Sequence, residues 1–202
     1  MNIVDERKLA LILSILKENP NPKYKLEQYS ITPEIASQAL LLAKEDIKNK
    51  VVFDFGCGSG RFAIGASLLG AKLAIGVDVD KEVLEIAKEN VKRVEEKTGI
   101  KISERIKWIC KKVENLDLKG DTVIQFPPMS RNADLIFLEK AMETGKKVYS
   151  FHKGTEEKKN KIEEIVKKFG GKIKFEKKFK YKLPWMEKGK FGYELSFFCI
   201  EL

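Results

Sequence analysis

The residues that build covalent or metal-bound frameworks are scarce in this sequence. Its 202 residues include only three cysteines, Cys57, Cys110 and Cys199, and one histidine, His152. An odd number of widely separated cysteines argues against a disulfide framework. Without a CxxC pair or a histidine cluster, a metal site has no ligand set. We therefore expect neither disulfides nor a bound metal.

Long apolar runs are lacking as well. Hydrophobic residues make up 43% of the chain, yet no run approaches the roughly 20 residues that a membrane-spanning helix needs. Charges interrupt residues 1–17, so this segment does not resemble a signal peptide. We see no repeat, low-complexity stretch or linker. The sequence predicts a cytoplasmic protein with no membrane partner and one domain over 1–202, with a helical extension over 1–48 and a core over 49–202.

The balance of charge favours a polyanionic partner. The chain has 39 Lys and Arg against 30 Asp and Glu, a formal net charge of +9. Binding such a surface to nucleic acid is favourable because each neutralised phosphate releases counterions. A composition rich in Lys and Glu is also typical of thermophilic proteins, whatever they bind. Both interpretations stay open, with nucleic acid favoured.

Helix-like and strand-like segments alternate along the chain. Apolar spacing predicts helices over 3–17, 33–46, 61–69, 81–97, 133–142 and 156–169, and strands over 51–55, 73–78, 105–110, 121–125 and 147–151. Thr32 is the expected N-cap of the second helix. Segments 172–182 and 191–202 alternate apolar and polar residues, which predicts a final antiparallel pair. We expect an α/β fold with a seven-stranded mixed sheet and ligands at the carboxyl ends of its parallel strands.

A glycine-rich turn follows the first predicted strand. Residues 54–60 comprise Asp-Phe-Gly-Cys-Gly-Ser-Gly. Glycines there let the backbone approach a ligand closely. The spacing differs from the dinucleotide fingerprint GxGxxG, whose third glycine would fall at Arg61. A carboxylate at Asp54 suits a ligand that carries an ammonium and a sulfonium better than it suits a phosphate.

Asp78 is the second half of this signal. It ends the second predicted strand in Gly-Val-Asp, where a carboxylate binds the hydroxyls of a ribose. Asp80 is expected to cap the helix that begins at Lys81. An ordinary turn and a solvated loop carboxylate are the structural alternatives. Together the two features predict S-adenosylmethionine (SAM) as cofactor, bound by Asp54, Gly56, Cys57, Gly58, Ser59, Gly60, Asp78 and Val79.

These segments, with Leu26–Tyr29 ahead of them, resemble a known family. Residues 54–65, and further similarity through 78–80, 121–124, 133–138 and 148–153, resemble the archaeal and eukaryotic small-subunit rRNA adenosine (N6) methyltransferases. The resemblance covers nearly the whole chain. It implies the Rossmann-like fold of class I SAM-dependent methyltransferases and methyl transfer to the exocyclic amine of an adenosine in structured, ribosomal RNA. It also adds Gln28 to the expected cofactor-binding residues, closing over the methionine end.

The catalytic motif departs from the family pattern. Family members end the fourth strand in Asn-Pro-Pro-Phe, where the Asn side chain and a proline carbonyl accept from the target amine and the ring stacks on the flipped base. Here the expected acceptor pocket consists of Gln125, Phe126, Pro127, Pro128 and Met129, with Phe126 in place of the Asn and Met129 in place of the ring. A phenylalanine cannot accept a hydrogen bond. Losing such a contact typically costs on the order of 10²–10³ in rate.

Three interpretations of this departure remain open. Gln125 could supply the missing amide, although adjacent strand residues point to opposite faces. The pocket could instead take another base position or a protein side chain. In the third interpretation the chain keeps the fold and the RNA surface as a non-catalytic RNA-binding or assembly protein.

Two further family positions differ. The Asp that reads the cofactor's adenine amine after the third strand is replaced by Lys111, and a usual Thr near the cofactor by Ile31. Glu114 could substitute for the missing acid, although its spacing differs. The only histidine, His152, falls near the expected pocket, where a structural or RNA-contacting role is favoured over a general base.

The last third of the chain alternates lysines and aromatics. Segment 172–182 could bind RNA through phosphates and stacked bases, or form an edge strand with lysines outward. Trp185 and Met186 could line the target pocket. Because eukaryotic relatives work with a small activator protein that pairs with a sheet edge, the resemblance also implies such a partner.

Overall fold

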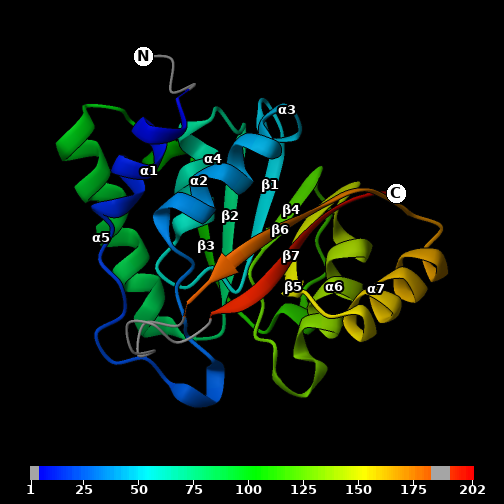
Figure 1. Cartoon of the computed structure of the whole chain (residues 1–202). Coiled ribbons are helices and arrows are strands. Elements are labelled where there is room, and N and C mark those ends of the chain that lie inside the picture. The colour runs from blue at the N-terminus through cyan, green and yellow to red at the C-terminus, as the bar shows by residue number, and fades with distance from the viewer. Residues whose placement is uncertain (1–4, 183–191) are drawn as a thin grey trace.

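A seven-stranded mixed sheet forms the centre of the fold (Figure 1). The computed structural model describes residues 5–182 and 192–202, so Trp185 and Met186 lie outside the described residues. The strands are β1 Val51–Phe55, β2 Leu73–Asp78, β3 Ile106–Cys110, β4 Thr122–Gln125, β5 Lys147–Lys153, β6 Lys172–Tyr181 and β7 Tyr193–Glu201. The helices are α1 Glu6–Ser14, α2 Pro33–Leu42, α3 Lys44–Ile47, α4 Arg61–Leu68, α5 Lys81–Thr98, α6 Ala133–Thr144 and α7 Glu156–Lys168.

The strand order is β3-β2-β1-β4-β5-β7-β6. Strands β1 to β5 pair in parallel. Strand β7 runs antiparallel between β5 and β6, with a register shift between Ile173 and Phe175. The predicted seven-stranded mixed sheet with a C-terminal antiparallel pair is therefore confirmed. This is the fold of class I SAM-dependent methyltransferases, and it gathers the carboxyl ends of five strands along one edge.

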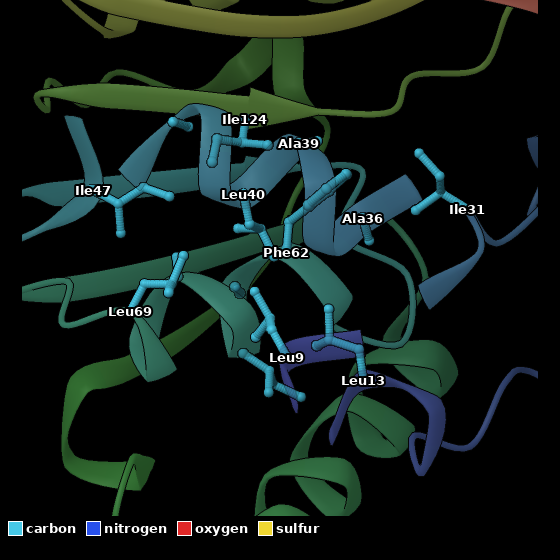
Figure 2. Close-up of a cluster of buried hydrophobic side chains, with 14 of the residues drawn as sticks. Leu9, Leu13, Ile31, Ala36, Ala39, Leu40, Ile47, Phe62, Leu69 and Ile124 are labelled. Atoms are coloured by element: carbon cyan, nitrogen blue, oxygen red, sulfur yellow. The ribbon is translucent and has the colours of Figure 1, made fainter. Parts of the chain in front are cut away.

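Helices cover both faces of the sheet. Apolar side chains of α1 to α5 pack on one face, where Leu9 and Leu13 of α1 lie near Leu40 of α2 and Phe62 of α4 (Figure 2). Helices α6 and α7 pack on the other face through a second buried cluster that includes Leu138. None of the described helices is long and apolar enough to cross a membrane.

The predicted helix over 33–46 is in fact two helices, α2 and α3. They meet at Ala43, whose φ of −90° and ψ of 1° leave the helical region. Tertiary contacts account for the break, because Tyr149 donates to the Asp46 carboxylate at 2.6 Å and the Thr122 hydroxyl donates to the Asp46 carbonyl. These bonds tie the turn to β4 and β5. The predicted N-cap Thr32 is confirmed, since its hydroxyl accepts from the Ile35 amide at 3.3 Å.

The segment between α1 and α2 (residues 15–32) lies across the carboxyl edge of the sheet and forms one wall of the site. It is fastened to the core by polar contacts. Lys17 and Asn90 exchange hydrogen bonds of 2.8 and 2.9 Å, and the Tyr181 hydroxyl donates to the Ser30 carbonyl at 3.0 Å. The buried Arg61 guanidinium donates to the Ile31 carbonyl and pairs with Glu18 at 3.1 Å.

Candidate cofactor and acceptor site

The glycine loop after β1 takes a conformation that favours glycine. Gly56, Gly58 and Gly60 have φ values of 66°, 51° and 89°. A Cβ atom at Gly60 would lie 2.6 Å from the Trp108 ring, whereas at Gly58 no atom lies within 4 Å of that position. Gly60 therefore allows close packing against the sheet, and Gly58 leaves the loop backbone open to a ligand.

Asp54 fixes the loop to the helix that follows it. Its side chain is 2% exposed and accepts from the Ala63 amide at 2.9 Å. Burial raises the pKa of this carboxyl to about 7, with a smaller contribution from the charge of Asp78. A cationic ligand would favour the ionised form.

Asp78 stands at the carboxyl end of β2 and faces the glycine loop. Its two oxygens accept from the amides of Gly58 and Asp80, each at 2.9 Å, and the residue is 8% exposed. Burial raises the pKa of the Asp78 carboxyl. An ionised carboxylate has about four acceptor positions, so each oxygen keeps room for a further donor.

A cavity of about 930 Å³ lies above these residues. Of the residues predicted to bind the cofactor, Gln28, Asp54, Gly56, Cys57, Gly58, Ser59, Asp78 and Val79 line it. Gly60 lies behind the loop, against Trp108. The structure thus brings together residues from the N-terminal segment, β1 and β2.

Gln28 lines the cavity with its amide engaged by protein groups. Its Nε2 donates to Asp80 at 2.8 Å, and its Oε1 accepts from the Asn19 side chain at 2.9 Å and the Lys23 amide at 2.8 Å. Asp80 also caps α5 through the Glu82 amide, as predicted, and pairs with the Lys23 ammonium at 2.9 Å. Gln28 therefore holds the N-terminal segment against the residues that follow Asp78.

The far end of the cavity combines apolar walls with charges. Val79, Val113 and Phe137 line it together with Lys111, Lys112 and Glu114, and Ile31 lines it from the N-terminal segment. The Lys111 amide donates to the Asp78 carbonyl at 2.9 Å. Glu114 makes no hydrogen bond or ion pair within residues 5–182 and 192–202. In those same ranges no group of three His, Cys, Asp or Glu side chains is placed to hold a metal ion.

The acceptor loop, residues 126–131, follows β4. The half-buried Phe126 ring packs edge-on against Phe151 and Tyr181, with centroid distances of 5.7 and 5.5 Å. The Glu27 carboxylate accepts from the amides of Met129 at 2.9 Å and Ser130 at 3.0 Å. The sequence did not single out Glu27 as functional. Its left-handed backbone, with φ of 48°, is visible only in the structure.

A second pocket of about 150 Å³ adjoins the cofactor cavity. Glu27, Tyr29, Phe126, Pro128 and Ser130 line both spaces, so they form a shared wall. The remaining lining residues of the second pocket are Pro127, Met129, Lys153, Tyr181, Tyr193 and Leu195. Of the predicted acceptor residues, Phe126 to Met129 therefore meet at one pocket with aromatic walls.

Gln125 lies elsewhere, which corrects the idea that it supplies the missing amide. Its side chain is fully buried on the α6 side of the sheet and donates to the Ser150 hydroxyl at 2.9 Å. Its Oε1 has no partner within the described residues. Adjacent strand residues point to opposite faces, so Gln125 turns away where Phe126 turns toward the pocket.

His152 belongs to this buried polar network and not to the pocket. Its two ring nitrogens lie 2.7 Å from the Ser150 hydroxyl and 2.9 Å from Asp134, which also binds the Lys158 ammonium at 2.9 Å. Burial lowers the pKa of His152. A neutral ring without access to the cavity fits a structural role, one of the two favoured by the sequence.

Known proteins share this sequence and fold. The family profile "Ribosomal protein L11 methyltransferase (PrmA)" matches residues 36–126. The chain is 38% identical to the uncharacterised protein MJ0284 of Methanocaldococcus jannaschii, over 85% of this chain and 80% of that one. It is 34% identical to the rRNA N(6)-adenosine-methyltransferase Mettl5 of Drosophila melanogaster, over 73% and 72%. The crystal structure of PH1948 from Pyrococcus horikoshii, a candidate RNA methyltransferase, covers 97% of both chains with a TM-score of 0.86 and 33% identity.

Proposed function

The chain belongs to the METTL5-like family of rRNA N6-adenosine methyltransferases, and we propose that it transfers a methyl group from SAM to the exocyclic amine of an adenosine in ribosomal RNA. The observation that carries this proposal is the wall shared by the two spaces. Phe126 and Pro128 line both the large cavity and the aromatic pocket. A methyl donor in one and a base in the other would meet there.

The large cavity suits SAM. Two buried carboxylates, Asp54 and Asp78, line it, and the loop backbone at Gly58 is open to a ligand. In this proposal the free acceptor positions of Asp78 bind the ribose hydroxyls, and Asp54 favours the cationic methionine end. Bound SAM supplies a methyl group activated by its sulfonium.

The acceptor pocket suits a flat ring but offers few groups to an amine. Tyr29, Phe126, Tyr181 and Tyr193 supply aromatic surface, on which a flipped base can stack. Because Phe126 supplies no acceptor, we assign the contact with the target amine to the Pro127 carbonyl. One acceptor in place of two predicts slow transfer.

One observation favours the alternative, an RNA-binding or assembly factor without transfer activity. The Phe126 ring is packed into an aromatic cluster of the core, so the acceptor loop keeps its shape without the polar contacts of transfer. Such a factor, like an enzyme with an activator, could add a partner strand to either outer strand of the sheet, β3 or β6.

The first experiment is calorimetric titration with SAM. We compare the wild type with Asp78→Asn, which keeps the shape but removes the charge, and with Asp117→Asn, an exposed acid outside the cavity, as control. Micromolar binding that weakens by roughly 10- to 100-fold in Asp78→Asn alone is expected from the loss of charge-assisted hydrogen bonds.

A methylation assay with labelled SAM and ribosomal RNA then separates the two functions. Incorporation at an adenosine amine supports the enzyme. SAM binding without incorporation into any RNA supports the non-catalytic factor. Absence of SAM binding in the wild type would refute the cofactor and with it the proposed enzyme.

A further inference from the structure

The openings of the two spaces are rimmed by unpaired basic side chains. Lys25, Lys111, Lys112 and Arg131 line the cofactor cavity, and Lys153 lines the acceptor pocket. All five are exposed. Within residues 5–182 and 192–202 none of them makes an ion pair or a side-chain hydrogen bond. Positive charge is therefore available to a ligand at both openings.

Acidic side chains do not balance this charge. Among the carboxylates that line the two spaces, Asp54 and Asp78 are buried, and Glu27 accepts from the amides of the acceptor loop. Only Glu114 is both exposed and unpaired in the described part of the chain. The openings consequently attract an anion larger than the cofactor.

Strained backbone is concentrated beside the acceptor pocket. Four non-glycine residues among those described have positive φ: Glu27, Asn49, Arg131 and Asn132. Three of them adjoin the acceptor loop. Left-handed backbone costs such residues roughly 1–2 kcal/mol each, and strain of this kind clusters at functional sites.

The strained turn at Arg131 is held from both sides. Glu27 binds the Met129 and Ser130 amides that precede it. The Asn132 side chain, which follows it, accepts from the Lys158 ammonium at 3.2 Å, and Lys158 is anchored by the buried Asp134 at 2.9 Å. The surroundings thus fix the backbone of Arg131 while its guanidinium stays exposed on the cavity wall.

We propose that Arg131 and Lys153 form a phosphate clamp that positions an RNA strand over the acceptor pocket. This inference rests on the proposed function and extends it, because it assigns the RNA to a surface. Arg131 lines one of the two adjoining spaces and Lys153 the other, so phosphates on either side of a flipped nucleotide can reach them. A guanidinium matches a phosphate with two parallel hydrogen bonds.

The rim favours a single-stranded or looped segment. Tyr24 and Tyr193 are 73% and 51% exposed at the openings of the cofactor cavity and the acceptor pocket. Exposed aromatic rings beside basic side chains are the arrangement on which unpaired bases stack. A base within a regular duplex would first have to be unpaired to enter the pocket.

The test measures RNA binding by fluorescence anisotropy over a range of salt concentrations. The probe is a labelled single-stranded oligoadenylate, with the same strand annealed to its complement for comparison. The double variant Arg131→Gln/Lys153→Gln is matched by Lys92→Gln/Arg93→Gln, which removes the same charges from exposed positions of α5. SAM affinity is measured for every variant.

We expect the clamp variant to weaken binding of the single strand on the order of tenfold at low salt. Its logarithmic salt slope should fall by about 2, one for each lost phosphate contact. The α5 variant should follow the wild type, the annealed probe should bind more weakly than the single strand, and SAM affinity should be unchanged.

Other results overturn specific parts of the inference. Equal effects of the clamp and α5 variants would refute the clamp while leaving the proposed function intact. Weaker SAM binding in the clamp variant would assign Arg131 to the cofactor's carboxylate. Equal or tighter binding of the duplex would refute the single-stranded segment. SAM binding by a wild type that binds neither RNA would overturn the RNA substrate and the clamp together.

Discussion

The two halves of the site are stabilised by different interactions. In the cofactor half, the buried carboxylates Asp54 and Asp78 accept from backbone amides of the glycine loop and the helix after it. In the acceptor half, Phe126 is held by ring packing against Phe151 and Tyr181. Removing a partner of a buried polar group leaves that group unsatisfied and costs about 1–3 kcal/mol. A half-buried ring can be exchanged at the expense of packing alone.

This difference bears on how the acceptor half departs from its family while the cofactor half does not. Replacing Asp78 would leave two amides, of Gly58 and Asp80, without their acceptor. Phe126 makes no hydrogen bond through its side chain, so its position constrains the fold less. The comparison predicts that the cofactor half is intact and that transfer is limited by the acceptor half.

The largest effect is expected from Phe126→Asn. Restoring an amide on the wall shared by the two spaces should raise methyl transfer to adenosine by roughly 10²-fold. SAM affinity should change less than twofold, because the cofactor half is untouched. The measurement is incorporation of labelled methyl into RNA together with calorimetric titration.

Two variants separate the amide from the loss of the ring. Phe126→Ala removes the ring without adding an acceptor, and Phe175→Asn makes the same exchange at another half-buried ring of the aromatic cluster. Each should lower the free energy of unfolding by about 1–4 kcal/mol without a gain in transfer. An equal gain in Phe126→Ala would attribute the effect to space in the pocket, and no gain in Phe126→Asn would remove the acceptor half as the limit.

A smaller effect is expected from pH acting on the cofactor half. The folded-state pKa of Asp54 is raised to about 7, so the carboxyl is protonated below that pH and ionised above it. A cationic cofactor prefers the ionised form. SAM affinity should therefore tighten by up to about tenfold between pH 6 and pH 8.

The matched variant is Asp54→Asn, which should remove this part of the pH dependence. Because the pKa of Asp54 is raised on folding, its contribution to stability is present at low pH and is lost as the pH rises through about 7. Asp54→Asn should thus also raise the free energy of unfolding above pH 7. Identical pH profiles of SAM binding in wild type and variant would show that Asp54 does not face the cationic end.

The smallest effect concerns the far end of the cofactor cavity. Glu114 is the carboxylate there whose oxygens have no partner within the described residues, so we expect it to accept from the adenine amine in place of the acid replaced by Lys111. Glu114→Gln should weaken SAM binding by about three- to tenfold. Binding of an analogue that lacks the 6-amino group should be unaffected, and Asp117→Asn serves as control. Equal weakening for both ligands would refute the contact.

Much of the cofactor half was predictable from the sequence. The predicted strands over 51–55 and 73–78 agree with β1 and β2 at both ends, because each is a short apolar run followed by residues that end a strand. The glycines of the loop and Asp78 follow directly from those ends. Contacts between neighbouring elements in the chain therefore sufficed to bring most of the expected cofactor-binding residues to one cavity.

The acceptor half depended on tertiary contacts. Glu27 reaches the acceptor loop across about half the chain, and the Gln125 amide is held by Ser150 on the next strand. The break at Ala43 likewise depends on Asp46 binding to β4 and β5. No local pattern of residues specifies such partners.

The sequence by itself determined the strand–helix alternation, the glycine loop and the carboxylates at the strand ends, because hydrophobic periodicity and backbone freedom are local properties. Only the tertiary structure decided which way the side chains of Gln125 and Phe126 turn. It also decided which carboxylates bind the protein's own amides, and where the unpaired basic side chains gather. Burial and pairing depend on residues far apart in the chain, which meet only when the sheet and its covering helices have packed.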